Sequence, residues 1–150
     1  MKRIMFVCHG NICRSPMAEL VFKKLISEAG VTDLFYVSSS ATSTEEIGNP
    51  VYPPVRRLLS SLGISSEGKE AVQLSALDYG KYDMFIGMDS MNVRNMMRIF
   101  GTDPEDKVMK LMDFVSGGDV LDPWYTGDFE ATYRDVLSGC RGLLSALLET

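Results

Sequence analysis

The sequence predicts a single α/β domain, in which a four-stranded parallel sheet carries helices on both faces. Short apolar runs alternate along the chain with longer segments whose apolar residues recur at helical spacing. Strands that alternate with helices favour a parallel sheet covered on both sides. The chain has 150 residues, 45% of them hydrophobic, which is enough for one core, and no repeat or linker-like stretch divides it.

The first strand and helix flank a turn-rich segment. Residues 3–7 form a short apolar run that ends at a turn, as a buried strand does. Pro16 at a first helical position and Gly30 just past the end bracket a helix over residues 16–29. A weaker pattern at residues 36–38 predicts the second strand.

The middle of the chain repeats this alternation. Pro53 and Pro54 open a helix that Gly63 ends, and residues 83–88 form the third strand, an apolar run of strand length. The apolar face of this helix is formed by Val55, Leu58, Leu59 and Leu62.

The last third contains two further helices and the fourth strand. Asp89 or Ser90 caps a helix that runs to about Phe100, and residues 108–112 form the strand. The final helix has the clearest pattern, since one stripe contains Phe129, Tyr133, Val136, Leu137, Cys140, Leu143, Leu144 and Leu147.

Charge and cysteine content exclude several classes of protein. The net charge of −5 argues against nonspecific nucleic-acid binding, which needs clustered cations. No apolar run approaches the length of a membrane span, and the N-terminus lacks the core of a signal peptide. Three cysteines suggest reduced thiols in the cytoplasm rather than a disulfide framework, and a single histidine makes a zinc site improbable. We therefore expect no metal, cofactor, nucleic acid or membrane partner.

The segment between the first strand and helix has the composition of an anion-binding loop. Five residues separate Cys8 from Arg14, enough for inward-pointing N–H groups to surround a tetrahedral anion at a helix N-terminus. Gly10 and Asn11 tolerate the unusual φ angles that such a curl requires. Arg14 offers a planar fork for two phosphate oxygens. The expected anion-binding residues are His9, Gly10, Asn11, Ile12, Cys13 and Ser15.

Cys8 is the candidate nucleophile. The positive field that holds a dianion also favours the thiolate, which needs no general base. Ser15 is placed to hydrogen-bond the thiolate and help it leave. Cleavage of a phosphate monoester also needs a proton for the leaving oxygen. Asp122 is the best candidate donor, in a loop where Trp124 and Tyr125 would form a slot for an aromatic leaving group. The alternative for this loop is a surface turn whose aromatic side chains cap the core.

The segments VCHGNICRSPMAE and DPWY resemble the low-molecular-weight protein tyrosine phosphatase family, and similarity runs along nearly the whole chain. The resemblance implies a metal-independent phosphatase of phosphotyrosine proteins or small aryl phosphates that releases inorganic phosphate. It implies Cys8 as the phosphocysteine nucleophile, Arg14 as the phosphate clamp and Asp122 as general acid and then base. It further implies that Asn11 holds the loop in shape, and Ile12 fits the tyrosine-directed members.

The chain departs from the family pattern at three places. Residues 38–44 read Ser-Ser-Ser-Ala-Thr-Ser-Thr where many relatives have a Ser-Ala-Gly-Thr-like stretch. Acids occur near Glu45, where many relatives have an aromatic residue on the rim of the slot, and this weakens the expected binding of acidic phosphopeptides. Gly68 and Lys69 stand where the family usually has a histidine, which predicts a rewired support for the loop.

Several alternatives stay open at this stage. Cys13 is either a packing residue or the partner of Cys8 in a protective disulfide. An arsenate reductase can share such a loop but needs further relay cysteines, and none occurs between Arg14 and Gly139. A phosphoprotein-binding module would need neither a thiolate nor an acid. The pattern fits a monomer or a weak dimer.

Overall fold

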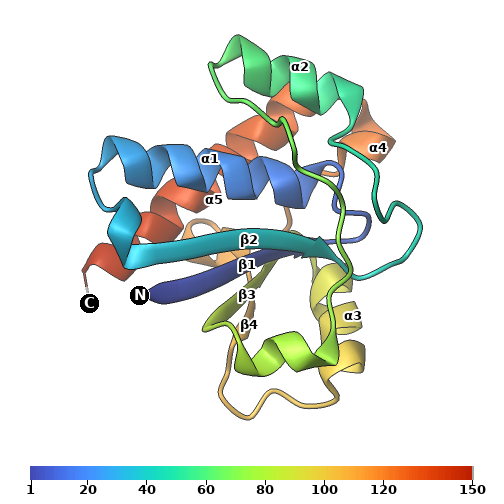
Figure 1. Ribbon diagram of the computed structural model, residues 1–150, viewed down its shortest axis with the longest axis vertical. Coiled ribbons are helices and arrows are strands. Elements are labelled where there is room, and N and C mark those ends of the chain that lie inside the picture. The colour runs from blue at the N-terminus through green and yellow to red at the C-terminus, as the bar shows by residue number, and fades with distance from the viewer. Residues whose placement is uncertain (150) are drawn as a thin grey trace.

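The computed structural model describes residues 1–149 and contains one sheet of four parallel strands (Figure 1). The strands are β1 (Lys2–Cys8), β2 (Phe35–Ala41), β3 (Met84–Gly87) and β4 (Val108–Lys110). Their order is β2-β1-β3-β4, so the chain moves outward from β1 on one side and then continues on the other. Ligands of open parallel sheets bind at such a switch point, beyond the carboxyl ends of the strands. The residue at that end of β1 is Cys8.

Helices cover both faces of this sheet, as predicted (Figure 1). On one face α1 packs against β1, β2 and α5, whereas α3 contacts β3 and β4 on the other. The helices are α1 (Arg14–Glu28), α2 (Pro53–Ser61), α3 (Ser90–Phe100), α4 (Pro123–Thr126) and α5 (Phe129–Leu148). Residues 1–149 also contain three short 3-10 helices: η1 (Thr32–Leu34), η2 (Ala76–Gly80) and η3 (Leu111–Phe114).

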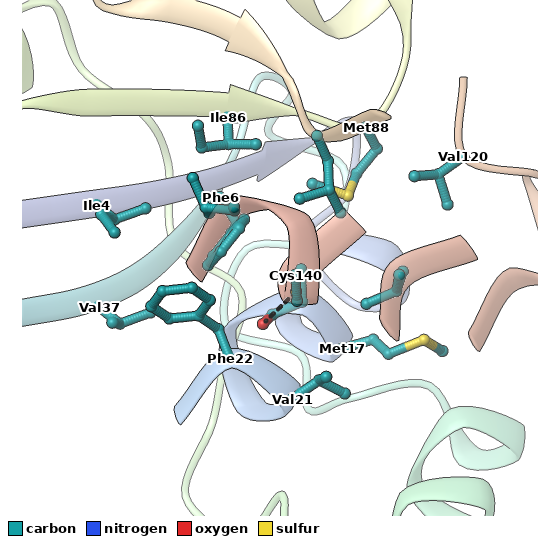
Figure 2. Close-up of a cluster of buried hydrophobic side chains, with 14 of the residues drawn as sticks. Ile4, Phe6, Met17, Val21, Phe22, Val37, Ile86, Met88, Val120 and Cys140 are labelled. Atoms are coloured by element: carbon teal, nitrogen blue, oxygen red, sulfur yellow. Dashed lines mark hydrogen bonds between the residues drawn. The ribbon is translucent and has the colours of Figure 1, made fainter. Parts of the chain in front are cut away.

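Both faces of β1 are buried, and each face contributes side chains to one of two apolar clusters that hold the layers together. Ile4 and Phe6 point toward α1 and α5, where Phe22 and Cys140 meet them (Figure 2). The Cys140 thiol contacts the Ala18 carbonyl oxygen at 3.7 Å and is fully buried, as its place on the apolar stripe predicts. The cluster on the α3 side consists of Met5, Val7, Leu74, Phe85 and Met96.

Strands β1 and β3 differ from their predicted bounds by one residue at each end, and three other elements differ by two residues or more at one end. Strand β2 continues to Ala41 because it pairs with β1 residue by residue as far as Cys8. The predicted strand over 108–112 ends at Lys110, where the Asp113 carboxylate accepts the Lys110 N–H at 3.0 Å and the chain turns into η3. Helix α1 begins at Arg14 rather than Pro16, since proline is tolerated within a first turn, whose N–H groups have no partner in the helix.

Candidate active site

The loop from Cys8 to Arg14 joins the end of β1 directly to the start of α1. Cys8 is buried, with its Sγ 3.0 Å from Ser15 Oγ and 3.3 Å from the Asn11 backbone nitrogen. Ser15 Oγ already accepts a hydrogen bond from Asn11 Nδ2 at 2.7 Å, so its own proton is free to point at the sulfur. Two donors therefore converge on Cys8 Sγ, an arrangement that stabilises a thiolate.

Asn11 holds the curl of the loop. Its φ angle of 58° lies in the left-handed region, which asparagine tolerates better than most residues. The side-chain amide makes four hydrogen bonds: Nδ2 donates to Ser15 Oγ and Ser39 Oγ, while Oδ1 accepts from the Val72 N–H and from Lys69 Nζ. These bonds offset the cost of the backbone conformation.

Gly10 serves the loop in a different way from the one predicted. Among the described residues of the loop, only Asn11 has a positive φ. Gly10 instead lies close to the neighbouring loop, because a Cβ there would be 3.3 Å from Glu46 Cγ. The expectation of an unusual φ at Gly10 is therefore wrong, and the structure instead places Gly10 close to the Glu46 side chain.

Arg14 is buried and surrounded by acceptors. Its Nη1 donates to the Val120 carbonyl at 3.0 Å, and its Nη2 lies 2.9 Å from Asp89 Oδ2 and 3.5 Å from Asp122 Oδ2. Burial alone would lower the pKa of Arg14, but the charges of Cys8, Asp122 and Asp89 raise it above its usual value. The guanidinium is thus a fixed cation beside the nucleophile. Asp89 also caps α3 by accepting the Asn92 N–H at 2.8 Å.

The segment that carries Asp122 is braced by α5. The Leu121 N–H donates to the Asp135 carboxylate at 3.0 Å, and Thr132 Oγ1 donates to the Leu121 carbonyl at 2.8 Å. Asp122 caps the one-turn helix α4, since its Oδ1 accepts the Trp124 N–H at 3.0 Å. This bond turns the other oxygen, Oδ2, toward Arg14.

A pocket of about 500 Å³ brings the predicted residues together. Its walls include all of the predicted site residues except Ser15, which is fully buried and contacts the Cys8 sulfur from behind. Trp124 and Tyr125 are strongly exposed at the mouth, with the Trp124 ring 5.7 Å from that of Tyr52. The aromatic side chains therefore line the entrance and do not cap the core. The pocket residues are Cys8, His9, Gly10, Asn11, Ile12, Cys13, Arg14, Glu45, Glu46, Asp89, Met91, Asn92, Asp122, Trp124 and Tyr125.

The remaining titratable loop residues lie at the edge of this pocket. His9 Nε2 is 3.1 Å from Glu45 Oε2, and both side chains are exposed. Cys13 is half-buried and, like Cys8 and Cys140, is a free thiol. Burial and the neighbouring Cys8 raise the pKa of Cys13 to about 12. Cys13 is therefore neutral at physiological pH.

Sequence reasoning missed the support beneath the loop. Glu19 is buried on α1, where its Oε1 accepts the Ser39 hydroxyl at 2.6 Å and lies 3.6 Å from Lys69 Nζ. The missing family histidine pointed to a rewired network, but no periodicity or spacing placed Lys69 in contact with Asn11. Within residues 1–149, no cluster of His, Cys, Asp and Glu side chains is suited to hold a metal ion, and no helix could cross a membrane.

Comparisons of sequence and of structure with known proteins agree on one family. The family described as "Low molecular weight phosphotyrosine protein phosphatase" matches residues 3–150. The chain is 35% identical, over 96% of its length and 94% of the relative, to the low molecular weight protein-tyrosine-phosphatase YfkJ of Bacillus subtilis. The crystal structure of YfkJ superposes with a TM-score of 0.95, covering 99% of this chain and 96% of that one.

Two other solved structures extend this likeness. SP-PTP, a low molecular weight protein tyrosine phosphatase from Streptococcus pyogenes, is 40% identical with a TM-score of 0.89, over 98% of this chain and 93% of that one. The Drosophila arginine phosphatase is 25% identical with a TM-score of 0.87, over 98% of each chain.

Proposed function

This chain belongs to the low molecular weight phosphotyrosine protein phosphatase family, and from that premise we propose that Cys8, Arg14 and Asp122 are its catalytic residues. The chain is a protein tyrosine phosphatase, which hydrolyses phosphotyrosine monoesters by cysteine-based chemistry. One observation carries the assignment of roles: Cys8, Arg14 and Asp122 line one pocket, and Arg14 Nη2 lies 3.5 Å from the Asp122 carboxylate. A phosphate on this guanidinium lies between a nucleophile and an acid.

In the first step the Cys8 thiolate attacks phosphorus and forms an S–P bond while the P–O bond to the tyrosine breaks. Arg14 and the loop N–H groups hold the equatorial oxygens, on which charge accumulates in the transition state. Protonated Asp122 gives its proton to the departing phenolate oxygen. The products are the phosphocysteine and a neutral tyrosine side chain.

In the second step water attacks the phosphocysteine, and the Asp122 carboxylate takes the proton of that water. The S–P bond breaks, inorganic phosphate leaves, and the electron pair returns to sulfur as a thiolate. The Ser15 hydroxyl, 3.0 Å from Cys8 Sγ, stabilises that charge. Arg14 and the loop amides supply the positive charge that a metal ion would otherwise provide.

The substrates we propose are phosphotyrosine proteins and small aryl phosphates. Trp124 and Tyr125 offer two aromatic faces at the mouth of the pocket for the leaving phenol ring. Because the nucleophile has to remain a thiolate and all three cysteines are free, we place the enzyme in the reducing cytoplasm.

The rim of the pocket refines the substrate class. Glu45 and Glu46 line the pocket together with Trp124 and Tyr125, and Glu45 Oε2 lies 3.1 Å from His9 Nε2. Residues that flank a phosphotyrosine pass this rim. Like charges repel, so acidic flanking residues reduce the rate of capture and basic ones increase it.

Hydrolysis of p-nitrophenyl phosphate and a phosphotyrosine peptide, each with a chelator present, tests the proposal. We expect the wild type to turn over both, and Cys8→Ser to lower kcat by at least about a thousandfold. Cys140→Ala, which removes a thiol from the core, is the matched control and retains turnover. A fully reduced wild type that hydrolyses neither compound would overturn the assignment.

A further inference from the structure

A buried ion pair beneath the loop joins α1 to a segment far along the chain. Lys69 Nζ lies 3.6 Å from Glu19 Oε1, and the two side chains are only 14% and 8% exposed. Glu19 Oε2 also accepts Lys23 Nζ at 2.6 Å. A lysine ammonium is seldom so enclosed unless several acceptors surround it.

The other acceptors of Lys69 belong to the Cys8 loop and its neighbour. Nζ is 3.2 Å from Asn11 Oδ1 and 3.3 Å from the Ser39 carbonyl oxygen. Together with the Val72 N–H, which donates to the same oxygen at 3.0 Å, the Lys69 ammonium fixes which end of the amide faces it, because only the oxygen accepts. The nitrogen end is then turned toward Ser15 and Ser39, and Ser15 in turn contacts Cys8 Sγ.

We propose that Lys69 is a positioning residue for catalysis, which fixes the Asn11 amide and through it the curl of the loop around the phosphate. This inference rests on the role proposed above for the Cys8 loop. Lys69 touches neither substrate nor sulfur and acts through Asn11. Burial lowers the pKa of Lys69 and the charge of Glu19 opposes this, as expected for an ammonium held inside by its partner.

The test compares Lys69→Met, which keeps the length of the side chain without its charge, with Lys69→Arg, which keeps a donor. We expect Lys69→Met to lower kcat about tenfold or more, because small displacements of catalytic groups are costly. We also expect inhibition by inorganic phosphate to weaken several-fold, and Lys69→Arg to recover most of both. Lys107→Met is the matched control, since that lysine is also half-buried and bonded to a carbonyl, but lies away from the pocket.

Two results separate positioning from stability. A lower fraction of folded enzyme would reduce apparent kcat and leave the phosphate inhibition constant unchanged, which would overturn the proposal. In an Asn11→Ala background, Lys69→Met should change kcat by less than about twofold, since the amide through which Lys69 acts is already absent. If the fold-losses in kcat of the two single variants multiplied in the double variant, the proposal would also be overturned. Lys23 and Ser39 still pair with Glu19 in the variant, which favours normal folding.

Phosphate binding distinguishes this proposal from the proposed function. The rise in thermal unfolding midpoint caused by inorganic phosphate needs no turnover, so it reports on the loop even if Cys8 proves not to be the nucleophile. We expect that rise to be smaller in Lys69→Met than in the wild type and in Lys107→Met. An equal rise in all three proteins would overturn the role of Lys69.

Discussion

The Cys8 loop and the Asp122 segment face each other across one pocket but differ in burial. Asn11 and Arg14 are 1% and 4% exposed, whereas Trp124 and Tyr125 are 70% and 86% exposed. The side chains of the loop are bonded to one another and to distant segments, while α4 is a single turn. The buried part binds the phosphoryl group, which all substrates share. The exposed part meets the leaving group and the peptide, which vary.

Thiol reactivity provides the largest contrast within the buried loop. We expect iodoacetamide at pH 7 to label Cys8 and leave Cys13 unlabelled. With a pKa of about 12, only roughly one Cys13 in 10⁵ is ionised at that pH, and the thiolate is the reactive form. Mass spectrometry of the labelled peptides, with and without phosphate as a protecting ligand, measures this. Comparable labelling of both cysteines would contradict the description of the loop.

Loss of the acid should depend on the leaving group. We expect Asp122→Ala to lower kcat for a phosphotyrosine peptide by about 10²- to 10⁴-fold, since general acid catalysis contributes that much. The loss for p-nitrophenyl phosphate should be smaller, because p-nitrophenolate leaves more readily without a proton. Steady-state kinetics with both substrates gives the comparison. Equal losses would argue that Asp122 acts only by holding Arg14.

Asn11 variants test whether the loop is rigid because of its side-chain bonds. We expect Asn11→Ala to lower kcat about tenfold or more and to lower the free energy of unfolding by about 1–3 kcal/mol, because buried partners lose their bonds. Asn11→Gly accepts the same φ without strain but lacks the bonds. Urea unfolding that shows full stability in Asn11→Gly would mean that backbone conformation alone holds the loop.

The exposed aromatic side chains should matter for binding and little for stability. We expect Trp124→Ala and Tyr125→Ala to raise KM for a phosphotyrosine peptide roughly fivefold by loss of stacking. The free energy of unfolding should stay within about 0.5 kcal/mol of the wild type, as for other exposed positions. Inhibition by inorganic phosphate should be unchanged, and a weaker inhibition would show that the two sides of the pocket are coupled.

The acidic rim should have the smallest effect. The double variant Glu45→Gln, Glu46→Gln is expected to raise kcat/KM about two- to threefold for phosphotyrosine peptides with acidic flanking residues, because exposed charges interact weakly. The gain should shrink as salt is added. Free phosphotyrosine serves as the control. A gain of the same size with this compound would point away from the flanking residues.

The sequence predicted those parts of the site that depend on local spacing. Cys8, Arg14 and the loop between them follow from a strand, a turn and a helix start, and the carboxyl end of β1 then places them at the switch point of the sheet. Asp122 could be identified because an acid, a proline and two aromatic residues stand together in one loop.

Contacts between distant segments could not be predicted in this way. The sequence pattern ended β2 too early because Ser39 and Ser40, although buried and bonded to other side chains, carry no apolar signal. Lys69 is the clearest case, since lysine is normally exposed and its partner Asn11 is 58 positions away. Its role depends on the fold as a whole.

The hydrogen bond from Arg14 to the Val120 carbonyl spans 106 positions, so it constrains when the enzyme matures during its synthesis. The ribosome makes Cys8 and Arg14 first, whereas Val120 follows 106 positions after Arg14. A nascent chain therefore carries a cysteine whose anion site is still incomplete. The phosphatase becomes competent only after the segment around Val120 has been made, and the folding of that segment sets the moment.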